Sequence, residues 1–243
     1  MIILSVGMPR AGSGWSYNLT NDLMLVSGAQ DARQIRQRYH LQTILTEVNC
    51  NIGALTPRRL LAVLVPSLLG NTFVIKAHAG PTPLARRFIH SGLMRTTYIY
   101  RDPRDAMLSA VEYGQRARQR GHDNAFARLV DFESALGFME DYVRISEAWL
   151  ADQDVLHTRY ENLLTDFDIE AARLAAFLGL DRKSQAVREV FDRHRPESAQ
   201  REGKGRHFSK GKIGRFRREW DEGQQQVMAE RFGAYLEKMD YEM

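Results

Sequence analysis

The sequence has one cysteine and no long apolar run, and these two features exclude several classes of protein. Cys50 alone cannot form an internal disulfide, and no spacing of cysteine and histidine matches a metal site. The longest apolar run, residues 60–69, is about half the length of a membrane-spanning helix, and Pro66 and Ser67 interrupt it. We therefore expect no membrane span and no bound metal, and we interpret residues 60–69 as a buried helix.

The N-terminal residues also lack the features of a secretory signal. No basic segment precedes the apolar residues 2–4, and the apolar stretch stops at Ser5. Together with the single cysteine, this predicts a reducing, cytoplasmic location. The 243 residues, 44% hydrophobic and 26% charged, favour one α/β domain over residues 1–243, although length alone also allows two small domains.

Positive charge is distributed unevenly along the chain. Residues 201–218, called the basic segment below, contain eight Lys or Arg and one acid, Glu202. This segment therefore carries +7, and the rest of the chain carries −3 of the total of +4. Such a concentration favours a local anionic ligand, with a solvated tail as the alternative.

Short apolar runs alternate with helical patterns along the sequence. Four runs rich in β-forming residues are predicted to be strands: residues 2–7, 73–76, 96–100 and 154–158. Helices are predicted at residues 15–26, 31–48, 57–69, 84–90, 104–120, 125–150, 169–178, 183–192 and 223–238. Residues 193–214 show no periodicity and are predicted to be a loop. The alternation predicts a three-layer α/β sandwich with a central parallel sheet, as in P-loop nucleotide kinases.

A glycine-rich segment, residues 7–16, lies between the first predicted strand and the first predicted helix. Backbone N–H groups at a helix N-terminus bind phosphate, and glycines let the backbone approach a ligand closely. The nucleotide-triphosphatase loop G-x-x-x-x-G-K-[ST] has lysine and a hydroxyl residue after its second glycine, whereas Ser13 and Gly14 follow Gly12 here. The segment therefore predicts a site for a phosphate-like anion without an obligate metal, and a simple glycine turn is the alternative.

Arg101 and Ser109 form a second candidate anion site. Arg101 ends the third predicted strand, and Ser109 lies about two turns into the helix that begins at Pro103. A strand end and one helix face can converge on one anion, with the arginine supplying paired donors. A proline-started helix with an ordinary salt bridge is the alternative.

Lys76 ends the second predicted strand, and His78 lies two residues after it. Histidine has an unperturbed pKa of about 6.5 and suits a general base near neutral pH. Lysine suits the stabilisation of negative charge that develops during a reaction. The alternative for His78 is a purely structural role.

The order of these motifs resembles that of the sulfotransferases that use 3′-phosphoadenosine 5′-phosphosulfate (PAPS). Residues 9–15 are similar to their 5′-phosphosulfate loop, except that Gly14 replaces the usual hydroxyl residue and Arg10 replaces the lysine of most cytosolic members. Residues 101–109 are similar to their 3′-phosphate motif. Residues 208–216 are similar to their C-terminal R-K-G-x-x-G-x-[WF] motif, although Ser209 replaces its arginine.

The resemblance implies a function and a set of site residues. It implies transfer of a sulfuryl group from PAPS to a hydroxyl or amine of a small-molecule or carbohydrate acceptor, with release of adenosine 3′,5′-bisphosphate (PAP) and without a required metal. It also implies that His78 is the catalytic base and that Lys76 and Arg10 stabilise the transferring group. Tyr160, in a Tyr-Glu-x-Leu motif, and Trp15 are expected near the adenine. The implied donor-binding residues are Arg10, Ala11, Gly12, Ser13, Gly14, Trp15, Arg101, Ser109, Tyr160, Lys210 and Gly211.

Two other functions stay open at this point. A metal-dependent P-loop kinase of nucleotides or small molecules would keep the fold and use Asp102 for magnesium. A non-enzymatic anion- or RNA-binding protein would also suit the basic segment, but no nucleic-acid module accompanies it, so no nucleic-acid partner is expected. The sequence determines neither the acceptor nor the oligomeric state. Five aromatic residues and one histidine suit an apolar or aromatic acceptor, and they suit core packing equally well: Tyr39, His40, Tyr113, Phe126, Phe132 and Phe138.

Overall fold

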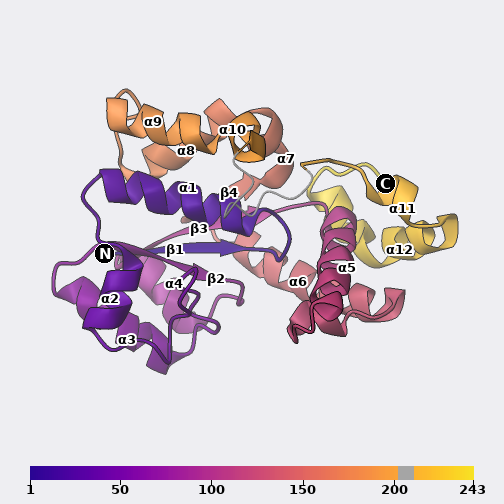
Figure 1. Ribbon diagram of the computed structural model, residues 1–243, viewed down its shortest axis with the longest axis horizontal. Helices are drawn as coiled ribbons and strands as arrows, with labels where there is room; N and C mark the ends of the chain where they lie inside the picture. The colour runs from indigo at the N-terminus through magenta and orange to yellow at the C-terminus, as the bar shows by residue number, and fades with distance from the viewer. Residues whose placement is uncertain (202–210) are drawn as a thin grey trace.

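The computed structural model describes residues 1–201 and 211–243, which form a three-layer α/β fold (Figure 1). Four strands form one parallel sheet in the order β2-β1-β3-β4. Their bounds are β1 (Ile2–Gly7), β2 (Phe73–Ala77), β3 (Met94–Tyr100) and β4 (Val155–Arg159). The predicted fold class is confirmed, and the four predicted strands are correct to within two residues at each end.

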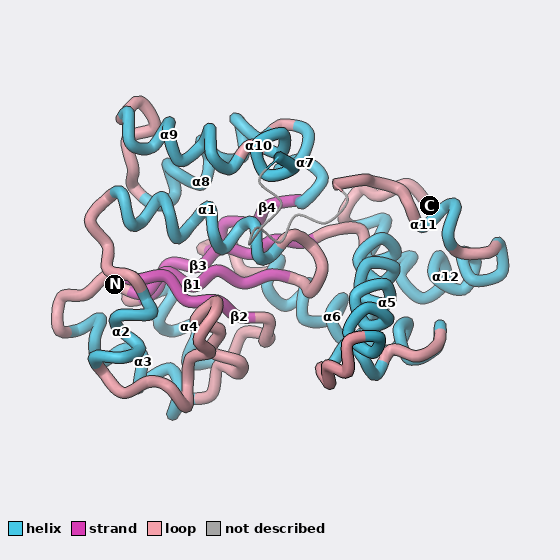
Figure 2. Tube along the Cα trace, in the orientation of Figure 1, coloured by secondary structure: helices cyan, strands magenta, loops and turns pink. Residues whose placement is uncertain are grey.

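Helices cover both faces of this sheet (Figure 2). The helices α1, α8 and α9 lie on one face, and α2, α3, α4 and α6 lie on the other. The helical elements are α1 (Ser13–Val26), α2 (Ala32–Arg38), α3 (Pro57–Leu68), α4 (Pro83–His90), α5 (Pro103–Gln119), η1 (Ala125–Arg128), α6 (Phe132–Leu150), α7 (Tyr160–Thr165), α8 (Phe167–Leu178), α9 (Gln185–His194), α10 (Pro196–Arg201), α11 (Phe216–Glu219) and α12 (Glu222–Lys238).

Alternate residues of β1 enter different hydrophobic cores. Ile2, Leu4 and Val6 pack with α2, α3 and α4, whereas Ile3 packs with α1, α8 and α9. A third core joins α5, α6 and α12 beyond the sheet. Because a central parallel strand is buried on both faces, the sequence of β1 is apolar on both sides, with buried Ser5 as its polar residue, rather than alternating.

The carboxyl ends of the four strands meet at one edge of the sheet. The chain leaves β1 towards β2 on one side, and β3 lies on the other side, so the strand order reverses at β1. Ligand sites of open parallel sheets lie outside the carboxyl ends of the strands at such a reversal. Met8, His78, Arg101 and Tyr160 directly follow the four strands.

The prediction of one helix over residues 31–48 is wrong in its second half. The helix α2 ends at Arg38, and His40 has a left-handed φ of 55° that a helix does not accommodate. Leu41 and Leu45 are both buried and lie at helical spacing, so their periodicity resembles a helix although they belong to turns.

The predictions for residues 125–150 and 193–214 also need correction. The expected long helix is split, because Asp131 caps α6 through the backbone N–H of Ser134 and η1 precedes it. Part of the predicted loop is helical, since α9 continues to His194 and α10 begins at Pro196. Lys210 lies outside the described residues.

The helix α3 is only half buried, in contrast to the prediction of a buried helix. Leu60 and Val63 enter the core, while Leu61, Val65 and Leu68 are 52–66% exposed. Within residues 1–201 and 211–243, no helix has both the length and the apolar character needed to cross a bilayer.

Gly114 in α5 and Gly137 in α6 provide a matched test of the packing of α5 against η1. A Cβ at Gly114 would lie 2.0 Å from the carbonyl oxygen of Phe126, whereas one at Gly137 meets no described atom within 4 Å. Gly114→Ala should lower the free energy of unfolding by about 1–3 kcal/mol through overpacking. Gly137→Ala should raise it by about 0.5–1 kcal/mol, because alanine is the better helix former. Urea unfolding followed by circular dichroism measures the free energy of unfolding of both variants. A Gly114→Ala protein as stable as the wild type would contradict the packing of α5 against η1.

Candidate active site

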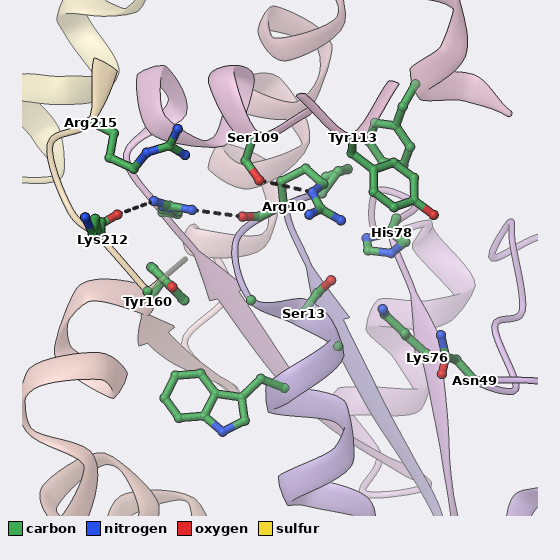
Figure 3. A pocket seen from close by; sticks show the side chains of 17 residues that line it. Arg10, Ser13, Asn49, Lys76, His78, Ser109, Tyr113, Tyr160, Lys212 and Arg215 are labelled. Atoms are coloured by element: carbon green, nitrogen blue, oxygen red, sulfur yellow. Dashed lines mark hydrogen bonds between the residues drawn. The ribbon is translucent and has the colours of Figure 1, made fainter. Parts of the chain in front are cut away.

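A cavity of about 220 Å³ lies at the carboxyl edge of the sheet, where α1 begins (Figure 3). All but one of the described residues that the sequence predicted for the site line it: Arg10, Gly12, Ser13, Gly14, Trp15, Lys76, His78, Arg101, Ser109, Tyr160 and Gly211. The exception is Ala11, which is fully buried in the core around α5 and donates its N–H to the carbonyl oxygen of Met8 at 3.2 Å.

The loop before α1 presents backbone N–H groups to this cavity. Gly12 has a φ of 76° and precedes the helix, and its carbonyl oxygen accepts the first intrahelical hydrogen bond, from Ser16 at 3.0 Å. Helix geometry therefore leaves the N–H groups of Ser13 and Gly14 without a partner inside α1, and no described side chain caps this end. The positive end of the helix dipole adds to an environment that favours anions.

Gly12 also allows the loop to lie close to Tyr160. A Cβ at this position would lie 2.6 Å from the Tyr160 ring, too close for any side chain. Arg10, two residues earlier, has a left-handed φ of 64°, which is uncommon for a residue with a side chain. The chain thus accepts an unfavourable conformation at Arg10 in order to shape this loop.

Arg101 lies where three chain segments meet. Its Nη1 donates to the carbonyl oxygen of Arg10 at 3.3 Å, and its Nη2 donates to Asp105 at 3.2 Å and to the carbonyl oxygen of Lys212 at 3.0 Å. Its guanidinium lies over the Tyr160 ring, 4.5 Å from the centroid. The buried Nε has no hydrogen-bond partner among the described residues, so this donor suits a ligand that accepts hydrogen bonds.

Arg10 connects two walls of the cavity. Its Nε donates to the hydroxyl of Ser109 at 3.2 Å, and its guanidinium lies 4.6 Å from the centroid of the Tyr113 ring. Tyr113 packs edge-on against Phe126, with ring centroids 5.2 Å apart, and both rings line the cavity. We call these two rings the aromatic wall. Figure 3 shows Arg10 between Ser109 and this wall.

His78 follows β2 and is oriented by one hydrogen bond. Its Nδ1 lies 2.7 Å from the carbonyl oxygen of Gly7. Because a carbonyl oxygen only accepts, Nδ1 carries the proton of the neutral ring and Nε2 keeps its lone pair. Burial lowers the pKa of His78 to about 4, and the positive charge of Lys76 contributes. The ring is therefore neutral near pH 7 and able to accept a proton at Nε2.

Lys76 supplies a buried cation beside this histidine. It is 6% exposed, and burial, followed by the charge of Arg10, lowers its pKa to about 8. Residues 50–52 hold its backbone, since the N–H of Lys76 donates to Cys50 at 3.2 Å and the N–H of Ile52 donates to Lys76 at 2.9 Å. No carboxylate contributes to its pKa in the described part of the chain, so an anionic ligand would stabilise its charge.

A family model described as sulfotransferase domain matches residues 2–241 of this chain. The chain belongs to the sulfotransferase family. Its reaction is therefore the transfer of a sulfuryl group. No curated protein sequence matches this sulfotransferase.

Solved structures share the fold of this sulfotransferase at low sequence identity. Retinol dehydratase in complex with androsterone and PAP is 19% identical, with a TM-score of 0.62 over 100% of this chain and 82% of the other. Mouse sulfotransferase SULT7A1 complexed with PAP is 16% identical, with a TM-score of 0.63 over 97% and 84%. Sulfotransferase STF9 from Mycobacterium avium is 13% identical, with a TM-score of 0.52 over 100% and 77%.

Four residues of the sulfotransferase cavity were neither predicted site residues nor acceptor candidates: Pro9, Asn49, Lys212 and Arg215. Asn49 lines it beside Lys76, directly after residues 31–48, which were predicted as one helix (Figure 3). Lys212 and Arg215 line the opposite side, and both lie in the basic segment and in the motif-like residues 208–216. Tyr39, His40, Phe132 and Phe138, predicted as acceptor candidates, do not line this cavity, whereas Tyr113 and Phe126 do.

Another cluster of titratable groups lies at the opposite edge of the sheet. His90 lies 3.6 Å from Asp152 and 3.4 Å from Asp154, and these three residues offer atoms close enough to share one cation. Arg86 already pairs with Asp152 at 3.3 Å. This arrangement explains the cluster as an ionic link between α4 and the start of β4 in the sulfotransferase fold.

The low pKa of His78 predicts a ring that stays neutral on mild acidification. Between pH 5.5 and 8 its ring carbon NMR signals should not move, whereas free histidine in the same buffer titrates near 6.5. His78→Ala assigns the signals. Lys76→Met should raise the pKa of His78, because the charge of Lys76 lowers it. A midpoint near 6.5 in the wild type would contradict the described environment.

Proposed function

We propose that this sulfotransferase uses PAPS as its donor and that the donor binds between the loop before α1 and Arg101. The observation that carries the proposal is one cavity lined both by Arg101, whose buried Nε lacks a described partner, and by the start of α1, where helix geometry leaves the N–H groups of Ser13 and Gly14 without an intrahelical partner. Two separated anion sites suit a nucleotide with phosphate groups at both its 5′ and its 3′ position. Neighbours of the same fold were crystallised with PAP, which supports the proposal.

The 5′ phosphosulfate is assigned to the loop before α1. The N–H groups of Ser13 and Gly14 and the hydroxyl of Ser13 supply donors there, and Gly14 contributes its backbone alone. The 3′-phosphate is assigned to Arg101 and Ser109, with Gly211 and Lys210 as further contacts. Ser109 now accepts from Arg10, so its hydroxyl hydrogen remains available as a donor.

The adenine is assigned to Trp15 and Tyr160. Trp15 is held rigidly, because its Nε1 donates to the carbonyl oxygen of His194 at 2.9 Å and its ring stacks on Phe167 at 5.9 Å. Trp15 meets Tyr160 edge-on at 6.4 Å between centroids. Rigid aromatic faces suit an adenine ring at little entropic cost.

The donor supplies an activated sulfuryl group, and the residues of this chain act on the acceptor and on charge. In the proposed reaction the acceptor oxygen bonds to sulfur, the bond from sulfur to the bridging oxygen breaks, and PAP leaves. His78 takes the acceptor proton at Nε2, with its ring oriented by the carbonyl oxygen of Gly7. Lys76 and Arg10 place positive charge where negative charge develops.

The acceptor is proposed to be a small molecule with an apolar body and a hydroxyl group. The aromatic wall gives the cavity that His78 lines an apolar face, and Asn49 adds a polar group to the same lining. Neighbours of the same fold were crystallised with androsterone and with retinol. A carbohydrate or an amine acceptor is the less supported alternative. We also propose a cytoplasmic location and a reaction that requires no metal.

Nucleotide binding tests the donor assignment. Isothermal calorimetry should show PAP binding without magnesium and much weaker binding of ATP, because the kinase-type lysine is missing from the loop. Arg101→Ala should raise the Kd for PAP by about 10- to 100-fold, through loss of a charge-assisted hydrogen bond. Magnesium-dependent ATP turnover would instead support the kinase alternative, and an unchanged Kd would remove Arg101 from the site.

Turnover tests the proton acceptor. An acceptor screen with sulfur-labelled donor should include a steroid alcohol, retinol, a simple phenol and a monosaccharide. With any acceptor that reacts, His78→Ala should lower kcat by about 100-fold or more while the Kd for PAP stays near that of the wild type. An unchanged kcat would show that another group takes the proton.

A further inference from the structure

A buried carboxylate, Asp105, connects Arg101 to the end of the basic segment. We propose that Asp105 is a positioning residue that seats residues 211–216 on α5 and so sets the affinity for the 3′-phosphate of the donor. This inference rests on the proposed function. It concerns how the anion site is assembled, since Asp105 does not itself line the cavity.

Asp105 uses both carboxylate oxygens to hold three donors from two parts of the chain. Oδ2 accepts from Nη2 of Arg101 at 3.2 Å and from the backbone N–H of Gly214 at 2.8 Å. Oδ1 accepts from the backbone N–H of Phe216 at 3.0 Å. The side chain is only 1% exposed, so water competes little for these hydrogen bonds.

Further contacts dock the same residues along α5. Arg215 pairs with Glu112, about two turns after Asp105. Phe216 is buried, and the guanidinium of Arg104 lies 4.1 Å from the centroid of its ring. Lys212 accepts from Arg101 through its carbonyl oxygen. Residues 212–216 are therefore attached to α5 and Arg101 at almost every position.

The attachment of residues 211–216 to α5 determines which cationic groups line the cavity. Gly211, Lys212 and Arg215 line it from the docked residues, and Arg101 lines it from the end of β3. Asp105 occupies one Nη group of Arg101 while it holds Gly214 and Phe216, so the same carboxylate orients the guanidinium and places the segment opposite. A shift of the segment would change both sides of the anion site together.

The negative charge of Asp105 allows a positioning role to be distinguished from a purely electrostatic one. A carboxylate near a phosphate site repels the ligand, so its removal would tighten anion binding if electrostatics alone mattered. If Asp105 acts by positioning, removal of its carboxylate weakens PAP binding, and the lost affinity is the part that the 3′-phosphate contributes. PAP and adenosine 5′-monophosphate (AMP) separate these effects, because they differ only in that phosphate.

The experiment compares PAP and AMP binding to Asp105→Asn and to the wild type. PAP is titrated directly in a calorimeter, and AMP is measured by competition against PAP. Asparagine keeps the shape but cannot accept at both positions, so we expect the Kd for PAP to rise about tenfold or more and that for AMP to change less than about twofold. Glu140→Gln is the matched control, since Glu140 is a carboxylate that pairs with exposed Arg231.

An unchanged or lower Kd for PAP, or an equal loss for PAP and AMP, overturns the positioning role. Should Asp105→Asn fail to fold by circular dichroism, Glu112→Gln carries the test, because it loosens Arg215 in the same docked residues. A wild-type protein that does not bind PAP refutes the proposed function itself, which is a different result from a variant that binds as the wild type does.

Discussion

The parallel direction of the four strands is the constraint on which the site depends. In a parallel sheet every carboxyl end lies at the same edge, so residues that follow different strands meet although they are far apart in sequence. His78 follows β2, Arg101 follows β3 and Tyr160 follows β4, while the loop before α1 follows β1. Since β1 is flanked by β2 and β3, the loop lies between His78 on one side and Arg101 on the other.

This convergence gathers positive groups that repel one another. Lys76 has a lowered pKa because of burial and the charge of Arg10, and both cations together with burial lower the pKa of His78. Such an arrangement lowers the stability of the protein alone, and a bound anion relieves it, so a ligand selective for the folded chain also stabilises the fold. Burial, with this repulsion added, lowers the pKa of His78 and keeps its ring neutral, which a proton acceptor requires. One electrostatic arrangement thus serves binding of an anion and removal of a proton.

The sequence predicts the sheet and most of the candidate site, but not the groups that support them. The strands are found because each is a short run rich in β-forming residues, and the site residues because their motifs resemble those of the sulfotransferase family. Asn49 is missed because the helical spacing of Leu41 and Leu45 extends the predicted helix to residue 48, whereas residues 47–49 form a turn. The partners of Asp105 are also invisible in the sequence, since Gly214 and Phe216 lie 109 and 111 residues away.

The replacement of lysine by Arg10 has a structural consequence for the whole cavity. A lysine ammonium is a point charge, whereas the planar guanidinium donates a hydrogen bond and stacks on a ring at the same time. Arg10 uses both properties, with Ser109 on the donor side and Tyr113 in the aromatic wall. Since its carbonyl oxygen also accepts from Arg101, this one residue contacts the proposed 3′-phosphate site through its backbone and the proposed acceptor wall through its side chain. We therefore expect donor binding and acceptor binding to be coupled through Arg10. If either ligand moves the Arg10 side chain, the surface that the other ligand contacts changes as well.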